Sequence, residues 1–211
     1  MNALLITNGE IKDYGYMKRY ISNYDAVYCC DGGVRHFEAL GISPDVIVGD
    51  FDSAEEAAFE KYVNAGAKIF KFPSEKDCTD TELGLRKAIE DGATNITVIG
   101  GIGKRFDHSL ANAHILAYAL EKSVTAKIVD EHNEIVLIDK ETTIEGSKGD
   151  IISLIPLTTE AACVTVTGVK YPLADRTLKI GSSFSVSNEM VDNTAKISLT
   201  SGLLFVMRSW D

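Results

Sequence analysis

The chain has 211 residues, of which 45% are hydrophobic and 25% are charged, a balance typical of an ordinary globular protein. Its formal net charge of −10 argues against nucleic acid as the main partner, because nucleic-acid-binding surfaces need an excess of Lys and Arg. No apolar stretch approaches the ~20 residues that span a bilayer, and the start of the chain lacks the basic segment of a signal peptide. We therefore expect neither a membrane nor a secretory role.

The first 130 residues alternate short apolar runs with amphipathic segments. The predicted strands are Leu4–Thr7, Ala26–Cys30, Val46–Val48, Lys68–Phe72, Ile96–Ile99 and Ala126–Val129. The predicted helices are Tyr14–Tyr20, Val34–Leu40, Ala54–Ala65, Glu82–Asp91 and Ser109–Glu121. This alternation predicts βαβ units and a doubly wound, mostly parallel α/β sheet. The last helix is expected to face the core with a stripe that includes Leu110 and His114.

From about residue 131 the helical periodicity fades and short β-type runs follow one another. The predicted strands are Glu134–Ile138, Ile151–Ile155, Cys163–Thr167, Thr177–Ile180, Phe184–Val186, Ala195–Leu199 and Leu203–Met207. Many short strands separated by turn residues indicate an antiparallel sandwich or barrel. We therefore divide the chain into an α/β domain, residues 1–130, and an antiparallel β domain, residues 131–211.

The cysteines give no sign of a metal centre or of disulfide bonds. Cys29, Cys30, Cys78 and Cys163 show no CxxC spacing, and the adjacent pair lies inside a predicted strand, where cysteine usually fills the core. This usage fits a reducing, cytoplasmic setting.

Asp50 and Asp52 follow an apolar run and stand one residue apart. Alternate residues of an extended segment point to the same side, so both carboxylates can converge on one point. Mg²⁺ is usually held by one or two carboxylates together with substrate phosphates. The pair therefore predicts a magnesium site, although Ser53 and Glu56 have capping-box spacing and the acidic cluster could equally begin a helix.

A second acidic cluster, Asp77 and Asp80, follows about one βα unit later. Thr79 and Glu82 again have capping-box spacing, which leaves the same structural interpretation open. In open α/β sheets such strand-to-helix junctions gather at the carboxyl edge, where ligands bind. Two acidic clusters at such junctions favour a metal-dependent nucleotide enzyme.

Glycine-rich turns follow two further strands. Gly101 begins a turn that carries Lys104 and Arg105, and backbone N–H groups in such a turn can approach phosphates while the cations neutralise charge. The Walker A and GxGxxG fingerprints are both incomplete here, so a purely structural turn remains open. Asp31-Gly32-Gly33 has the same position after its strand, and a helix cap is an equal alternative.

The sequence contains no motif for a protein nucleophile. A GxSxG elbow is absent, and no cysteine lies in an activating context. The histidines show no metal-ligand spacing, and we expect hydrogen-bonding roles for them, including His108 beside Asp107. Carboxylates with a basic glycine loop favour direct phosphoryl-type transfer, in which positioning and charge neutralisation supply most of the catalysis.

Taken together, these motifs resemble the bacterial thiamine pyrophosphokinases nearly from end to end. The matching pieces are Asp31-Gly32-Gly33, Gly49–Ser53, Lys76–Glu82, Gly100-Gly101, Arg105–His108, Gly168–Leu173, Ser187-Asn188-Glu189 and Thr200–Leu204. The resemblance implies an N-terminal α/β domain that binds ATP and Mg²⁺ and a C-terminal β-sandwich that binds thiamine. It also implies a homodimer with shared active sites, in which the diphosphate of ATP passes to the hydroxyl of thiamine and AMP is released.

The resemblance also implies roles for individual residues. The expected Mg²⁺ and catalytic carboxylates are Asp50, Asp52 and Asp80, with Asp107 lining the reacting pocket. The expected nucleotide and phosphate contacts are Asp31, Gly32, Gly33, Asp77, Thr79, Gly101 and Arg105. The expected thiamine-binding residues are Ser187 and Asn188. The general base is left open between Asp80 and Asp107.

Two other classes of function compete with this interpretation. Asp50-Phe51-Asp52-Ser53 superficially resembles the DxD of metal-dependent phosphatases and sugar-nucleotide transferases, although a haloacid-type phosphatase would normally carry Thr or Val at Ala54. A thiamine- or nucleotide-binding sensor without turnover is the other alternative. The products discriminate among the three, because only the kinase forms AMP from ATP and thiamine.

Overall fold

The computed structural model describes residues 1–49, 56–72 and 77–210. Asp50 and Asp52 lie outside these described residues. The chain folds into two compact units, Met1–Glu131 and His132–Asp211, so the division falls one residue after the boundary that the sequence indicated.

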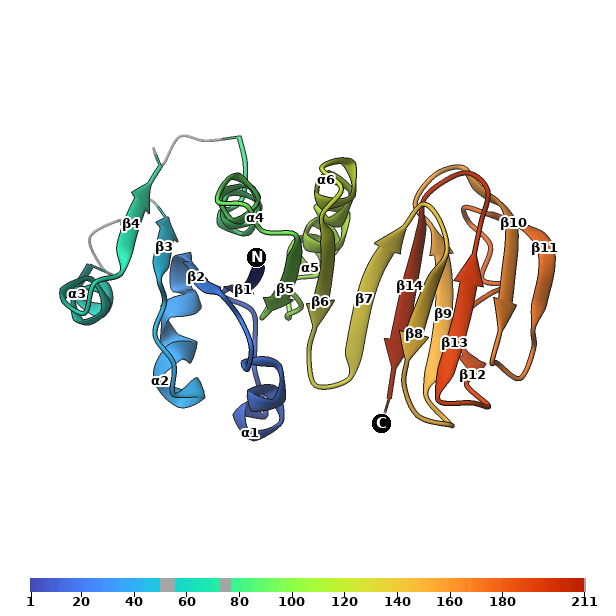
Figure 1. Ribbon diagram of the computed structural model, residues 1–211, viewed down its shortest axis with the longest axis horizontal. Helices are drawn as coiled ribbons and strands as arrows, with labels where there is room; N and C mark the ends of the chain where they lie inside the picture. The colour runs from blue at the N-terminus through green and yellow to red at the C-terminus, as the bar shows by residue number, and fades with distance from the viewer. Residues whose placement is uncertain (50–55, 73–76, 211) are drawn as a thin grey trace. The chain divides into compact units, whose positions relative to one another are not determined.

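The N-terminal unit is built on a parallel sheet with the strand order β6-β5-β1-β2-β3-β4 (Figure 1). The strands are β1 (Asn2–Ile6), β2 (Ala26–Cys30), β3 (Val46–Gly49), β4 (Lys68–Lys71), β5 (Asn95–Ile99) and β6 (Thr125–Val129). The inner strands are continuous apolar runs because both of their faces are buried. The edge strand β4 is mostly exposed and carries Lys68 and Lys71, which protect an open edge from pairing with another chain.

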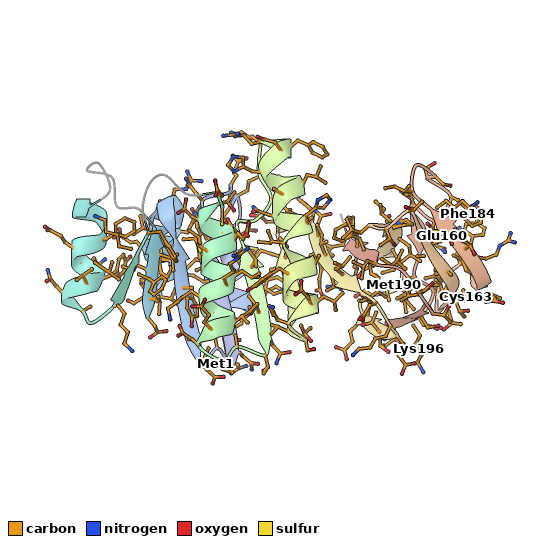
Figure 2. All side chains as sticks on the ribbon, turned by 90° about the horizontal axis from the view of Figure 1, so that it is seen from above. Met1, Glu160, Cys163, Phe184, Met190 and Lys196 are labelled. Carbon is orange, nitrogen blue, oxygen red and sulfur yellow. The ribbon has the colours of Figure 1, made fainter. Side chains whose placement is uncertain are left out.

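Helices cover both faces of this sheet. They are α1 (Tyr14–Met17), the 3₁₀ helices η1 (Lys18–Tyr20) and η2 (Asp31–His36), α2 (Phe37–Leu40), α3 (Glu56–Asn64), α4 (Asp80–Glu90), α5 (Phe106–His114) and α6 (Leu116–Glu121). Met17, Phe37 and Phe59 bring α1, α2 and α3 into one core with Leu4 and Ile6 of β1. On the opposite face, α4 and the α5–α6 pair run side by side over the strands (Figure 2). The doubly wound α/β prediction is therefore confirmed.

The predicted core stripe of the last helix is wrong. Leu110 is 44% exposed and His114 is also exposed, whereas Ala113, Leu116 and Ala119 are buried. The stripe that faces the core is displaced by one position from the predicted one, so that Ala113, Leu116 and Ala119 point inward. Ile115, which keeps right-handed helical dihedral angles, separates α5 from α6.

The C-terminal unit contains two antiparallel sheet segments, ordered β12-β9-β14-β7 and β11-β10-β13-β8. The strands are β7 (Asn133–Ile138), β8 (Thr142–Glu145), β9 (Ile151–Pro156), β10 (Glu160–Thr167), β11 (Leu173–Lys179), β12 (Asn188–Glu189), β13 (Thr194–Ser198) and β14 (Leu204–Ser209). Inward-facing side chains of both segments, among them Ile152, Val164, Ile197 and Leu204, form one core between them. The predicted antiparallel sandwich is confirmed.

One predicted strand of this unit, Phe184–Val186, is wrong. Residues 184–186 form turns and bends, and Phe184 is 62% exposed at the surface (Figure 2). The chain turns here because Ser187 adopts the left-handed conformation, with φ at 63°, before β12 pairs with β9. The strands β8 and β12 were not predicted, since β8 carries a single buried apolar residue, Ile144, and β12 is only two residues long.

No helix in the described part of the chain is long and apolar enough to cross a membrane.

Candidate active site

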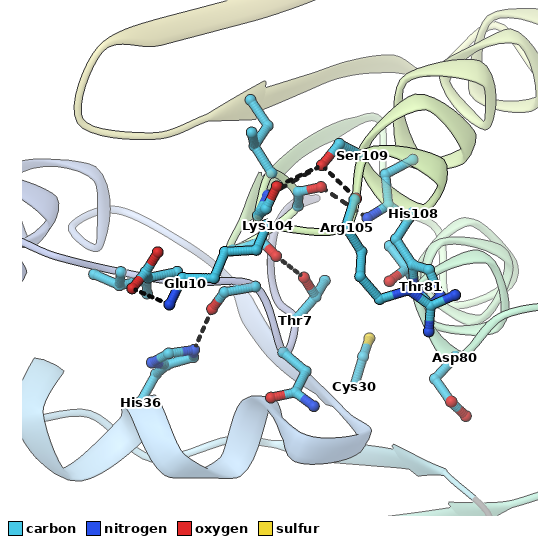
Figure 3. A pocket seen from close by; sticks show the side chains of 18 of the residues that line it. Thr7, Glu10, Cys30, His36, Asp80, Thr81, Lys104, Arg105, His108 and Ser109 are labelled. Atoms are coloured by element: carbon cyan, nitrogen blue, oxygen red, sulfur yellow. Dashed lines mark hydrogen bonds and ion pairs between the residues drawn. The ribbon is translucent and has the colours of Figure 1, made fainter.

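A cavity of about 650 Å³ opens at the carboxyl edge of the parallel sheet (Figure 3). The chain segments that follow β1, β2 and β5 line it together with the N-terminus of α4. Strands β1 and β5 are neighbours in the middle of the sheet, so their carboxyl ends reach the cavity side by side. This is the edge at which open α/β sheets bind their ligands.

The loops after β1 and β5 are tied directly to each other. The Thr7 N–H donates to the carbonyl of Ile99 at 2.9 Å, and the Gly9 N–H donates to the carbonyl of Gly100 at 2.8 Å. The Thr7 hydroxyl donates to the same Gly100 carbonyl. A Cβ at Gly9 would overlap the Gly100 oxygen, and Gly100 itself has φ at 71°, so this contact requires glycine at both positions.

The glycine loop after β5 is fixed by α5. The buried side chain of Asn112 donates to the Gly101 carbonyl at 2.8 Å. The Ser109 hydroxyl accepts from the Gly103 N–H at 3.0 Å and lies 3.1 Å from the Arg105 carbonyl, to which it can donate. The loop therefore reaches the cavity with a fixed backbone, which suits the binding of an anion by N–H groups and nearby cations.

Two cations stand on this loop, and both are exposed. Lys104 lies 3.3 Å from Glu10. Arg105 forms a forked pair with Asp107, with distances of 3.2 Å from Nε to Oδ1 and 2.6 Å from Nη2 to Oδ2. The hydrogen bond from Arg105 lowers the pKa of Asp107 to about 2, and Asp107 in turn raises the pKa of Arg105. Arg105, but not Asp107, lines the cavity.

The N-terminus of α4 brings oxygen ligands to the opposite wall. Thr79 is the N-cap of the helix, and its hydroxyl accepts from the Glu82 N–H at 3.2 Å, as the capping-box spacing predicts. Thr79, Asp80 and Thr81 line the cavity, and the Arg105 side chain extends toward Asp80 and Thr81 (Figure 3). Asp77 is exposed and does not line the cavity.

The segment after β2 supports the cavity from behind. A Cβ at Gly32 would overlap the side-chain amide of Asn8, and a Cβ at Gly33 would overlap the carbonyl of Ile6. Both glycines are buried and neither lines the cavity, so they allow η2 to pack closely against the end of β1. Asp31 begins η2.

Arg35 and His36, also on η2, bind the loop after β1. Arg35 Nη2 donates to the carbonyls of Asn8 at 2.6 Å and Gly9 at 3.1 Å. His36 is 2% exposed, and its Nε2 lies 2.9 Å from the Gly9 carbonyl while its Nδ1 lies 2.8 Å from the Tyr14 hydroxyl. Burial lowers the pKa of His36, and the charge of Arg35 lowers it further, despite the opposing effect of the Gly9 hydrogen bond.

A second cavity, of about 500 Å³, lies within the C-terminal unit and includes both Ser187 and Asn188 in its wall. The Asn188 side chain accepts from the Tyr171 N–H at 3.0 Å and donates to the Tyr171 carbonyl at 2.7 Å, which fixes the loop that carries Tyr171. The Ser187 N–H donates to the Ser153 hydroxyl at 3.0 Å. Tyr171 and Phe184 present aromatic rings at this cavity, and both are more than 60% exposed.

The described residues offer an incomplete metal site. They contain no group of three or more His, Cys, Asp or Glu side chains that could hold a metal ion. Asp80 and the hydroxyls of Thr79 and Thr81 are nevertheless hard oxygen donors on one wall of the cavity. This donor set fits Mg²⁺, which needs only one or two carboxylates when phosphates complete its coordination.

The first cavity thus brings together Thr79, Asp80, Gly101 and Arg105 from the predicted set. The sequence analysis missed the contribution of the first strand, where Thr7, Asn8 and Glu10 also line the cavity. A usable signal existed, because the end of β1 in such a sheet lies at the ligand-binding edge whatever residues it carries. Other missed lining residues are Arg35, His36, Ser109 and Asn112.

Comparison with known families covers nearly the whole chain. Residues 17–128 match the family model described as "Thiamin pyrophosphokinase, catalytic domain", and residues 134–204 match "Thiamin pyrophosphokinase, vitamin B1 binding domain". Among curated proteins, the thiamine pyrophosphokinase of Bacillus subtilis is 32% identical over 183 residues, covering 86% of each chain. Thiamine pyrophosphokinase 1 of Oryza sativa is 31% identical over 209 residues, covering 85% of this chain and 77% of its own.

Solved structures agree with this assignment. The thiamine pyrophosphokinase of B. subtilis has a TM-score of 0.87 and 29% identity, with both chains covered completely. The thiamin pyrophosphokinase of Geobacillus thermodenitrificans has a TM-score of 0.84 and 27% identity, covering 100% of this chain and 98% of its own. These matches favour the kinase interpretation over the phosphatase and sensor alternatives. The chain therefore belongs to the thiamin pyrophosphokinase family.

Proposed function

We propose that this thiamine diphosphokinase binds ATP in the cavity of its N-terminal unit and transfers the diphosphate of ATP to the hydroxyl of thiamine, releasing AMP. One observation supports the proposal above all. Lys104 and Arg105 of the fixed glycine loop and Asp80 at the N-terminus of α4 line the same cavity at the carboxyl edge of the sheet. Phosphoryl-type transfer needs this combination, because positioning and charge neutralisation supply most of its catalysis.

Mg²⁺ is the proposed cofactor. Asp80 would hold it together with Asp50 and Asp52 and the phosphates of ATP, a ligand set of the kind that Mg²⁺ prefers. When bound, the ion would neutralise charge on the transferring group. Thr79, as the N-cap, keeps the first turn of α4 and with it Asp80 at the cavity wall, and Asp77 adds negative charge to the same loop.

The glycine loop is the proposed phosphate site. Gly101 shapes the turn, and Arg105 offers a planar guanidinium that suits phosphate oxygens. Asp107 holds that guanidinium by two hydrogen bonds. Asp107 does not line the cavity whereas Asp80 does, so we assign the acceptance of the thiamine hydroxyl proton to Asp80. Gly32 and Gly33 contribute by letting η2 pack against the Asn8 side of the nucleotide pocket. The proposed nucleotide contact of Asp31 rests on the family resemblance alone.

The cavity of the C-terminal unit is the proposed thiamine site. Thiamine carries a permanent positive charge, which the faces of Tyr171 and Phe184 attract. Ser187 contributes a hydroxyl to the cavity wall, and Asn188 holds the Tyr171 loop in place.

The proposed assembly is a homodimer in which each active site draws on both chains. In-line transfer requires the thiamine hydroxyl and the β-phosphorus of ATP to come within a few ångströms of each other. The proposed compartment is the cytoplasm, where ATP is abundant and cysteines stay reduced, and within the described residues Cys29, Cys30, Cys78 and Cys163 form no disulfide bond.

The test is the substitution Asp80→Asn, which removes one charge from the cavity wall with almost no change of shape. We expect AMP formation to fall at least about 100-fold, since charge stabilisation of the transferring group is weakened. Glu90→Gln is the matched control, because Glu90 is exposed on the same helix and does not line the cavity. Similar AMP formation by the two variants at limiting Mg²⁺ would show that Asp80 has no role in the reaction.

A further inference from the structure

Tyr14, His36 and Arg35 form a connected set of contacts on the Asn8–Gly9 turn, which lines the cavity. Arg35 reaches both carbonyls of the turn, and His36 reaches the Gly9 carbonyl. The Gly9 N–H on the same turn is bound to Gly100. The turn is therefore held on one side by η2 and on the other by the glycine loop.

The shorter contacts of the His36 ring favour one neutral tautomer. A carbonyl oxygen can only accept, so Nε2 carries the proton that is donated to Gly9. Nδ1 is then an acceptor, and the Tyr14 hydroxyl donates to it. Arg35 Nε, which can only donate, lies 3.3 Å from the same Nε2, a longer contact than the 2.9 Å to the Gly9 carbonyl, and the charge of Arg35 opposes a second positive charge on the ring. The ring is thus a neutral bridge of fixed orientation between Tyr14 and the turn.

We propose that Tyr14, through His36, is a positioning residue for the nucleotide, with Arg35 as a parallel support of the same turn. The three hold the Asn8–Gly9 turn, and hence the Asn8 amide and the adjoining Gly100 loop, in the shape that ATP requires. This inference rests on the assignment of ATP to the cavity of the N-terminal unit. The conformational entropy of the Asn8–Gly9 turn is lost when the protein folds and not when ATP binds, so the turn already has its bound shape.

A double-mutant cycle tests the bridge. Tyr14→Phe removes a single oxygen from a half-buried ring, and His36→Leu removes the bridge itself. We expect each to raise the KM for ATP about 3- to 10-fold, the effect of one lost hydrogen bond, while kcat and the KM for thiamine change less than about 2-fold. The double variant is expected to match the larger single effect, because both changes break the same chain of contacts.

Three further measurements separate this role from a general structural one. His36→Gln, whose amide can donate to the Gly9 carbonyl, is expected to recover part of the lost affinity. Hydrogen exchange in a peptide that covers the Asn8–Gly9 turn is expected to accelerate in Tyr14→Phe. Tyr118→Phe is the matched control, since Tyr118 lies on α6 and does not line the cavity, and its KM for ATP is expected to stay at the wild-type value.

Two outcomes would overturn the positioning role. One is a KM for ATP in Tyr14→Phe equal to that in Tyr118→Phe, a comparison that holds even if His36→Leu does not fold. The other is additive effects in the cycle, which would mean that Tyr14 and His36 act independently. Titration of a non-hydrolysable ATP analogue into Arg105→Ala separates the proposed ATP site from the proposed positioning role of Tyr14. Unchanged binding by Arg105→Ala would mean that ATP does not bind in this cavity. Weakened binding by Arg105→Ala, together with an unchanged KM for ATP in Tyr14→Phe, would reject only the positioning role of Tyr14.

Discussion

Arg105 illustrates how a single residue can be prepared for its ligand before the ligand arrives. Asp107 holds the guanidinium with two hydrogen bonds, although both side chains are largely exposed. Because the pKa of Asp107 is lowered to about 2, the pair is intact above the ordinary carboxyl pKa of 3.8 and is lost only as pH falls through about 2. Titration of Asp107 therefore adds no pH dependence to stability or activity near neutrality.

Arg105→Ala is predicted to lose far more activity than Lys122→Ala. Both residues are exposed cations in a short-range ion pair, Arg105 with Asp107 and Lys122 with Glu121, but only Arg105 lines the cavity. Charge-assisted hydrogen bonds to phosphate contribute about 1.5–3 kcal/mol, so we expect kcat/KM for ATP to fall about 10- to 100-fold in Arg105→Ala. Equal kinetics in the two variants would make Arg105 a surface residue without a catalytic part.

Among the residues that line the first cavity, the sequence analysis identified those that belong to a local sequence pattern. Thr79 was identifiable because an N-cap depends on spacing within one turn, and Arg105 because it follows a glycine turn. His36 and Arg35 carry no such pattern. Their importance comes from contacts with Asn8 and Gly9, which lie 26 or 27 positions away in the sequence. The packing of η2 against the end of β1 creates these contacts.

At the scale of elements, the central feature is the contact between the loops after β1 and β5. Gly9→Ala is predicted to raise the KM for ATP and to lower the free energy of unfolding by about 1–3 kcal/mol, the usual cost of overpacking. A Cβ at Gly9 has no room beside the carbonyl of Gly100, and backbone atoms cannot move aside easily.

Gly103→Ala is the control for this prediction, because it changes the same glycine loop where space is available. The nearest atoms to a Cβ at Gly103 lie 3.6 Å away, an ordinary van der Waals distance. We expect its unfolding free energy to stay within about 0.5 kcal/mol of the wild type, as for most surface changes. Denaturant titration measures both variants, and equal destabilisation would show that the two loops adjust freely to each other.

Elements with a strong hydrophobic pattern were predicted, and weakly patterned ones were not. The buried parallel strands read as apolar runs, so β1, β2 and β3 could be located closely. The strand β12 exists because Asn188 and Glu189 pair with β9. Ser185 also forms hydrogen bonds with Leu154 of β9, but residues 184–186 form turns and a bend there and not a strand, despite their β-type composition. Pairing between distant segments is a tertiary property, which a local pattern does not contain.

At the scale of the whole molecule, the proposed shared active sites lead to a test by subunit mixing. Asp80→Asn and Ser187→Ala remove groups from different units of the chain. If each site combines the N-terminal unit of one chain with the C-terminal unit of another, a heterodimer of these variants contains one site without either substitution. We expect the mixture to recover up to about half of the wild-type activity per heterodimer, because geometry at that site is intact.

The measurement is AMP formation after confirmed subunit exchange, compared with each parent homodimer. Both parents are expected to be strongly impaired. A mixture that is no more active than the average of its parents would mean that each chain builds its active site from its own two units. The order of the units along the chain was predictable from the change in periodicity near residue 131, whereas the combination of chains is not encoded in any local pattern.

The position of β1 in the middle of the parallel sheet has a consequence for biosynthesis. This strand leaves the ribosome before its partner β5, with Ile6 paired to Ile99 at a separation of 93 positions. At roughly 5–20 residues per second, the apolar β1 waits about 5–20 seconds for that neighbour. Nascent chains that stall before β5 therefore expose a strand edge that is normally buried, which makes them substrates for chaperones and prone to aggregation.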